Sequence, residues 1–207
     1  MLLMAGLSVS ALWLATPAFA HHPFGGTTPA SFMEGILSGL GHPVIGIDHL
    51  LFTIATGLLA ARVTKGFVIP IAFVLASVLG TGIHLQSWDL PVPEIIVSLS
   101  VALFGLLLAL RRCPAVPLLA GMAAFAGVFH GYAYGEAIVG AEMSPLVGYL
   151  LGFTGIQLAI ALGSYTLARQ LVAPDAQNSA LPQLNLRFSG FAILGAGSAF
   201  LSSLLLG

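Results

Sequence analysis

Long apolar stretches separated by short polar breaks dominate this chain. After an apolar start over residues 1–20, six further stretches are long enough to cross a bilayer as helices, given about 1.5 Å of rise per residue and roughly 30 Å of hydrocarbon. We place them at residues 41–62, 67–85, 93–110, 116–139, 145–168 and 186–206. The pattern predicts an all-α integral membrane protein with six transmembrane helices.

The apolar start is a candidate signal peptide. It ends in TPAFA at residues 16–20, with small residues at the positions expected before a cleavage site. We therefore predict a signal peptide over 1–20, a periplasmic segment containing His and Gly over 21–40, and a six-helix transmembrane domain over 41–207. No Lys or Arg precedes the apolar run, so an uncleaved first transmembrane helix is the alternative.

The basic residues predict how the spans are oriented. All of them fall in, or at the edges of, the breaks after spans one, three and five: Arg62, Lys65, Arg111, Arg112, Arg169 and Arg187. By the positive-inside rule, these breaks face the cytoplasm. Both ends of the mature chain are then expected outside.

Composition narrows the possible functions further. The chain is 58% hydrophobic and only 6% charged, whereas about a quarter of the residues in a soluble domain are charged. It has no basic patch, so we expect no nucleic-acid partner. Cys113 is the single cysteine, which leaves neither a disulfide framework nor a thiolate cluster within one chain. A metal site would have to use His, carboxylate, backbone groups or the amino terminus.

The first span contains an unusual set of ionisable residues, namely His42, Asp48 and His49. Such groups cost roughly 2.5–3.5 kcal/mol at membrane depth, so they need a partner, a cavity or an ion. In a straight helix the two histidines would lie about 10 Å apart, too far to bind one ion together. Pro43 and Gly46 permit a bent or broken entry to the helix. Asp48 could be a further ligand or could orient an imidazole from behind.

A second set lies in span four, where His130 is followed by Glu136. His130 and His49 lie at similar depth, roughly 13 and 10 Å from the outer ends of their spans. We expect them to face a pocket that opens outward. His42 and Asp48 have the same spacing as His130 and Glu136, which allows spans one to three and four to six to be inverted repeats.

His84 and Gln157 are weaker candidates for this pocket. His84 is at the outer end of span two, where water can satisfy it. Gln157 lies deeper, in span five, where an interhelical hydrogen bond is the alternative. For the histidines of spans one and four, the alternative is a hydrogen-bonded pair that holds helices together.

The start of the mature chain is a separate candidate. If cleavage follows Ala20, the new amine, the amide nitrogen of His22 and the His22 imidazole could chelate a divalent ion beside His21. A fourth nitrogen from a helix would complete the square-planar geometry typical of Ni(II) or Cu(II). Alternatively, the two histidines occur there by chance.

Three segments together resemble the HupE/UreJ family: HHPFG at 21–25, GHPVIGIDHLL at 41–51 and FHGYAYGE at 129–136. Members of this family are bacterial membrane proteins of hydrogenase and urease gene clusters, regarded as nickel or in some cases cobalt permeases. The resemblance covers essentially the whole chain. It implies a metal-handling role for a set of five residues, His42, Asp48, His49, His130 and Glu136. Many members have a further histidine in span five, where this chain has Gln157.

The first segment is also similar to the His-x4-Asp-His signature of the nickel/cobalt transporter family. This chain has one extra residue between His42 and Asp48.

We therefore predict a permease, not an enzyme, that takes up Ni2+ across the bacterial inner membrane, with Co2+ or Zn2+ as other possible ions. Its partners would be the ion, the lipid bilayer and hydrogenase or urease maturation proteins. One alternative is an intramembrane zinc hydrolase that uses His49, His130 and His84 as ligands. Another is an assembly factor that delivers nickel without transporting it.

Overall fold

The structure, a computed structural model, describes residues 28–171 and 180–206. Every regular element in these ranges is helical: α2 (Phe32–Ile45), α3 (Ile47–Ala61), α4 (Val68–Leu85), α5 (Pro93–Ala109), α6 (Val116–Gly135), the 3-10 helix η2 (Glu136–Ile138), α7 (Met143–Leu171) and α8 (Ala180–Leu206). The predicted all-α fold is confirmed for this part of the chain. The predicted signal peptide lies outside the described residues.

Helix length and composition support a multi-pass membrane protein. Four helical segments are long and apolar enough to cross a membrane: α4, α6 with η2, α7 and α8. Together α2 and α3 would make a fifth span, although they are bent by 78° at the break between them. With 17 residues, α5 is about 25 Å long, less than the roughly 30 Å of a hydrocarbon core. By these criteria alone, the described residues support four or five spans rather than the predicted six.

The first described helix begins at Phe32, earlier than the span boundary expected at residue 41. The reason is a local capping arrangement. The Ser31 side chain accepts a hydrogen bond from the Glu34 backbone N–H at 3.2 Å, and the Glu34 carboxylate accepts one from Ala30 N–H at 2.8 Å. This Ser-x-x-Glu pattern satisfies N–H groups that a helix start leaves without partners.

Gly46 separates α2 from α3. Its ψ of 97° interrupts the helical path. A side chain there would collide with His49, because a Cβ on Gly46 would lie 2.7 Å from Cδ2 of the His49 ring. The predicted break near Pro43 and Gly46 is therefore present, and it turns the end of α2 toward the start of α3.

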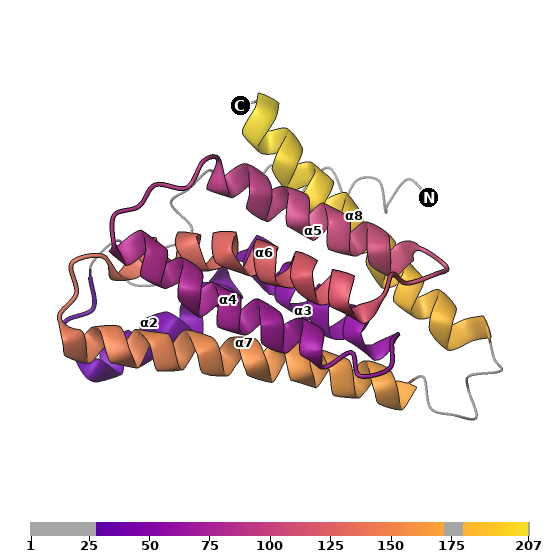
Figure 1. Cartoon of the computed structure of the whole chain (residues 1–207), viewed down its shortest axis with the longest axis horizontal. Coiled ribbons are helices and arrows are strands. Elements are labelled where there is room, and N and C mark those ends of the chain that lie inside the picture. The colour runs from indigo at the N-terminus through magenta and orange to yellow at the C-terminus, as the bar shows by residue number, and fades with distance from the viewer. Residues whose placement is uncertain (1–27, 172–179, 207) are drawn as a thin grey trace, which may run out of the picture.

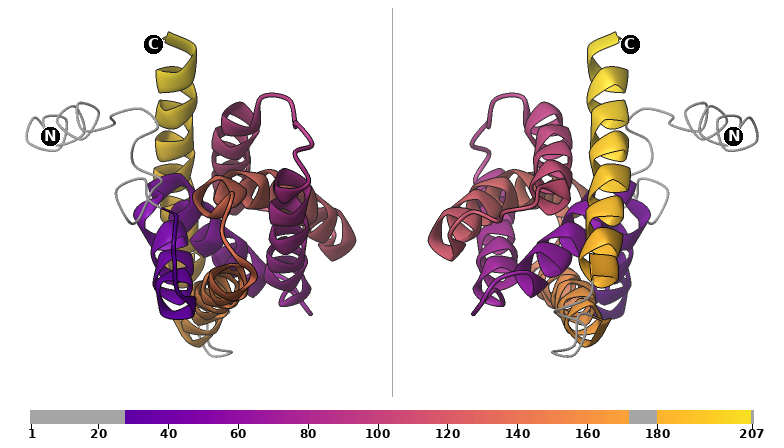
Figure 2. Two further views of the ribbon diagram at one scale, coloured as in Figure 1. Left: turned by 90° about the vertical axis from the view of Figure 1, so that its left-hand side faces the viewer. Right: turned by 90° about the vertical axis from the view of Figure 1, so that its right-hand side faces the viewer.

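The helices pack around α3. It contacts α2, α4, α5, α7 and α8, and its Phe52 and Leu59 side chains are fully buried in the main hydrophobic core. In Figure 1, α2 and α7 lie along one side of the bundle, α5 and α8 lie along the opposite side, and α3, α4 and α6 lie between them. Figure 2 shows the same arrangement from its two ends.

Glycines bring the helix backbones into direct contact, as is common inside membranes. A Cβ at each would collide with backbone atoms of a neighbouring helix: Gly80 with Val128, Gly131 with Ser77, Gly57 with Ala161, Gly39 with Tyr149, Gly105 with Leu194, and Gly197 with Ala102. Gly127 lies against Phe73 and Gly135 lies against His84, so α4 runs parallel to α6. The order of the other contacts shows that α5 runs antiparallel to α8. It also shows that α2 and α3 both follow the direction of α7.

Two arginines close one end of the bundle. The last carbonyls of a helix have no partner within it and carry partial negative charge. Arg62 donates to the Leu108 carbonyl at 2.7 Å and to the Arg111 carbonyl at 3.1 Å, while Arg187 donates to the Ala109 carbonyl at 2.8 Å. The ends of α3, α5 and α7 lie together at this end, on the right of Figure 1.

We predict that Gly80→Ala destabilises the protein by about 1–3 kcal/mol, because its methyl group forces α4 and α6 apart. The matched control is Gly82→Ala on the same helix, where a Cβ meets nothing within 4 Å. Since Ala is the better helix former, Gly82→Ala is expected to be neutral or to stabilise by up to about 1 kcal/mol. Thermal unfolding in detergent measures both, and equal melting temperatures for the two variants would contradict this account of the packing.

Candidate metal site

Three imidazoles meet inside the bundle. His42 comes from the last turn of α2, His49 from the first turn of α3, and His130 from α6, and their side chains are at most 1% exposed. The ring centroids of His42 and His49 are 5.8 Å apart, and those of His49 and His130 are 4.9 Å apart. The bend at Gly46 thus brings together two histidines that a straight helix would separate. We call these three residues the histidine cluster.

His49 and His130 are joined directly. Their Nδ1 atoms lie 2.8 Å apart, which is a hydrogen-bond distance. The other ring nitrogen of His130, Nε2, lies 2.9 Å from the Ser100 hydroxyl on α5. That hydroxyl in turn donates to the Val97 carbonyl at 2.7 Å. One chain of hydrogen bonds therefore links α3, α6 and α5.

A second series of hydrogen bonds holds His42 in place. Its Nδ1 atom lies 3.0 Å from the Tyr149 hydroxyl on α7, and that hydroxyl donates to the Tyr134 carbonyl on α6 at 2.7 Å. The Tyr134 ring packs against both imidazoles of the first span, with centroid distances of 5.1 Å to His42 and 4.5 Å to His49. The Tyr134 hydroxyl is buried and has no hydrogen-bond partner among the described residues.

Aromatic side chains enclose the cluster on its inner side. The Phe52 ring stacks on His130 with a centroid distance of 4.4 Å and an interplanar angle of 28°. The Phe73 ring meets His130 edge-on at 5.7 Å, and Phe104 packs against Phe52 at 4.6 Å. Such apolar surroundings strengthen the hydrogen bonds inside them, because the local dielectric is low.

Asp48 lies beside the cluster at the start of α3 and is partly buried. Its Oδ1 atom accepts a hydrogen bond from the His49 backbone N–H at 2.8 Å. A carboxylate in the first turn of a helix is favoured by the helix dipole.

For the remaining candidates the structure shows other contacts. His84 packs against Tyr132 with a centroid distance of 4.4 Å, and Glu136 is exposed at the start of η2. The Gln157 amide is 3.4 Å from the Ser77 hydroxyl and donates to the Phe153 carbonyl at 3.3 Å, so it links α7 to α4. His21 and His22 are outside the described residues.

The cluster supplies donors suited to a transition metal, since imidazole binds Ni, Zn, Cu and Fe ions well. In this conformation, no group of three or more His, Cys, Asp or Glu side chains within residues 28–171 and 180–206 is arranged to hold one ion. The two Nδ1 atoms of His49 and His130 are engaged with each other. Any ligand atoms on the cluster must therefore be found among its other nitrogens and the nearby carboxylate.

The sequence analysis singled out neither Tyr149 nor Ser100 as a partner of the histidines. A signal for Tyr149 was present, because a tyrosine within an apolar helix usually needs a hydrogen-bond partner for its hydroxyl. Ser100 carries no comparable signal, since serines in membrane helices often bond to their own backbone.

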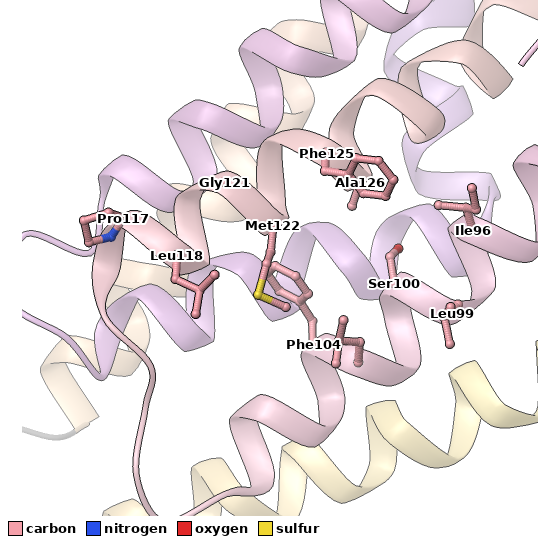
Figure 3. A pocket seen from close by; sticks show the side chains of 11 residues that line it. Ile96, Leu99, Ser100, Phe104, Pro117, Leu118, Gly121, Met122, Phe125 and Ala126 are labelled. Carbon is pink, nitrogen blue, oxygen red and sulfur yellow. The ribbon is translucent and has the colours of Figure 1, made fainter.

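A separate apolar pocket of about 350 Å³ lies between α5 and α6 (Figure 3). Leu118 and Phe125, which help to line it, are 57% and 60% exposed, so the pocket lies at the outer surface of the helices. Its polar lining residue is Ser100, the partner of His130. Through Ser100, the pocket borders the histidine cluster.

The fold and the cluster define a class of protein: a multi-pass helical membrane protein with three buried imidazoles between its helices. The chain belongs to the HupE/UreJ family. The model of this family, described as "HupE / UreJ protein", matches residues 9–200. It is similar to "Protein HupE" of Rhizobium leguminosarum bv. viciae, with 30% identity over 190 residues that cover 91% of this chain and 93% of that protein. No solved structure matches it. The resemblance drawn from the sequence motifs is confirmed.

We predict that Gly46→Ala lowers the affinity for Ni2+ by about 10–100-fold, the usual effect of disturbing the groups that orient a metal ligand. The added methyl group would lie 2.7 Å from Cδ2 of His49 and would push that imidazole away from His130. Calorimetric titration of the purified protein measures the affinity. Gly155→Ala, where a Cβ meets nothing within 4 Å, is the control. Unchanged Ni2+ affinity in a folded Gly46→Ala protein would separate Gly46 from the site.

Proposed function

We propose that this protein is a permease that takes up Ni2+, with Co2+ as its second substrate, across the bacterial inner membrane. The observation that carries the proposal is the burial of three imidazoles between helices of an apolar bundle. Buried polar groups at membrane depth are expensive, and in transport proteins they mark the path of the ion. Family membership supports the same reading, since the resemblance to HupE/UreJ implies nickel or cobalt handling.

The proposed topology has six spans, with α2 and α3 as one broken span and α5 as a short one. Helix directions support it. The first and third helices of the series α4, α5 and α6 run parallel, and α5 runs antiparallel to α8, as a chain that alternates across a membrane requires. All the Lys and Arg residues lie in connections or helix ends at the end of the bundle where α3, α5 and α7 finish, which we assign to the cytoplasm.

We also propose that the spans form two inverted halves, related by exchange of α3 with α6, α4 with α7, and α5 with α8. The packing supports this exchange. The parallel pair α4 and α6 corresponds to the parallel pair α7 and α3, and the antiparallel pair α5 and α8 would correspond to itself. The contact between His49 and His130 then falls at the interface of the halves, where inverted-repeat transporters place their substrate.

The ion would enter from the periplasm, with capture by His21 and His22, and would reach the histidine cluster beside Asp48. The polar contact between Gln157 and Ser77 offers a further station between α7 and α4. The membrane potential favours inward movement by about 2.3 kcal/mol per charge per 100 mV. Hydrogenase or urease maturation proteins would receive the ion in the cytoplasm.

The zinc-hydrolase alternative has less support. It requires His84 to join His49 and His130 around one ion, whereas His84 packs against Tyr132. An assembly factor that delivers nickel without transporting it would use the same cluster. It is distinguished from a permease by its lack of transport.

We predict saturable entry of Ni2+ into proteoliposomes that contain only this protein and an internal metal-sensitive dye. His49→Ala should reduce entry at least tenfold, because it removes the imidazole at the centre of the cluster. His84→Ala is the matched control and should retain entry. If a folded His49→Ala protein transports normally, the proposed path is wrong. Stoichiometric Ni2+ binding without entry would indicate the assembly factor, and loss of entry in His84→Ala as well would add His84 to the path.

A further inference from the structure

We propose that Ser100 and Tyr149 are positioning residues that fix where the protons lie on the histidine cluster. They leave the Nε2 atoms of His42 and His49 unprotonated and able to coordinate a divalent cation. This inference rests on the proposed function only for the identity of the ion. The proton positions themselves follow from the two hydrogen-bond chains.

The first series of hydrogen bonds begins at the Val97 carbonyl. A hydroxyl has one proton to donate, and a carbonyl oxygen can only accept. Ser100 gives its proton to the Val97 carbonyl at 2.7 Å, so its oxygen must accept from Nε2 of His130 at 2.9 Å. The proton of His130 is therefore on Nε2.

That position determines the state of His49. A neutral imidazole carries one N–H, so Nδ1 of His130 is an acceptor. The hydrogen bond of 2.8 Å between the two Nδ1 atoms then requires His49 to donate from Nδ1. Its Nε2 atom is left unprotonated. Neutral rings are the appropriate state here, because an ionised group among apolar side chains such as Phe52 and Phe73 is costly.

The second series of hydrogen bonds independently places the proton of His42 on Nδ1, as in His49. Tyr149 donates its hydroxyl proton to the Tyr134 carbonyl at 2.7 Å. Its oxygen therefore accepts from Nδ1 of His42 at 3.0 Å, and Nε2 of His42 is unprotonated.

Two separate series of hydrogen bonds, which involve different helices, thus give His42 and His49 the same tautomer. The centroids of these two rings lie 5.8 Å apart. This is the arrangement found in metal sites, where a ligating histidine donates its other N–H to an orienting group. An ion could bind both Nε2 atoms without displacing a proton from either ring. His130 would act by relaying the orientation set by Ser100 to His49.

The test for Ser100 begins with the metal-free, full-length protein. Nitrogen NMR of 15N-labelled histidine distinguishes protonated from unprotonated ring nitrogens, with signals assigned from His49→Ala and His130→Ala. We expect a proton on Nε2 of His130 and on Nδ1 of His49. Ser100→Ala should remove the preference and produce a mixture of tautomers, with a 10–100-fold loss of Ni2+ affinity. Ser100→Thr, which keeps the hydroxyl, should restore both, and Ser98→Ala on the same helix should change neither.

Tyr149→Phe tests the second chain. It should release the proton position on His42 and weaken Ni2+ binding to a similar extent, whereas Tyr165→Phe, on the same helix, should have no effect. A wild-type protein with its His130 proton on Nδ1, or with its His42 proton on Nε2, would overturn the inference. So would a Ser100→Ala or Tyr149→Phe protein with unaltered tautomers.

These outcomes are independent of transport. Failure of wild-type protein to admit Ni2+ into proteoliposomes would refute the permease, whereas the NMR result decides the positioning roles by itself.

Discussion

The hydrogen bond between the Nδ1 atoms of His49 and His130 is the contact on which the interior of this protein depends. It joins the first turn of α3 to the C-terminal half of α6, in a region where a buried polar atom without a partner would cost about 1–3 kcal/mol. The neighbouring features follow from it. Gly46 must lack a side chain so that the His49 ring can reach its position, and the Phe52 ring stacks on His130. The site is therefore part of the core.

The helices around this bond also approach one another closely. Gly80 and Gly131 allow backbone contact between α4 and α6, and the carbonyl of Gly131 accepts a hydrogen bond from Thr81 at 2.8 Å. Inside a membrane the hydrophobic effect does not drive helices together, so close packing and interhelical hydrogen bonds must do so. At the other end of the bundle, Arg62 and Arg187 donate hydrogen bonds to the last carbonyls of α5. Two of the basic residues that give the sequence its positive-inside pattern, Arg62 and Arg187, thus also bind the carbonyls at the end of α5.

Hydropathy alone was sufficient to predict an all-helical fold, because every backbone polar group in a bilayer must be satisfied within the helix and the spans are correspondingly long and apolar. The bend was also readable, from Pro43 and Gly46. The start of α2 was not predicted, although Ser31 and Glu34 form a recognisable cap. Which polar residues meet could not be read in full. Depth along separate helices placed His130 near His49, but it gave no information on helix rotation, which decides that His84 packs against Tyr132 and that Tyr149 reaches His42.

The charges at the site bear on how an ion would leave it. Two neutral imidazoles and one carboxylate, that of Asp48, would leave a divalent cation with net positive charge in an apolar surrounding. Such a charge is costly at membrane depth, so the site would hold the ion less firmly than one with two carboxylates. A permease needs this property, because an ion bound too tightly could not be released. The partly buried position of Asp48 at the α3 terminus suits that balance, since water and the helix dipole weaken its attraction for the cation. The same residues would make a poor storage site, and we regard this as the strongest physical argument for passage over retention.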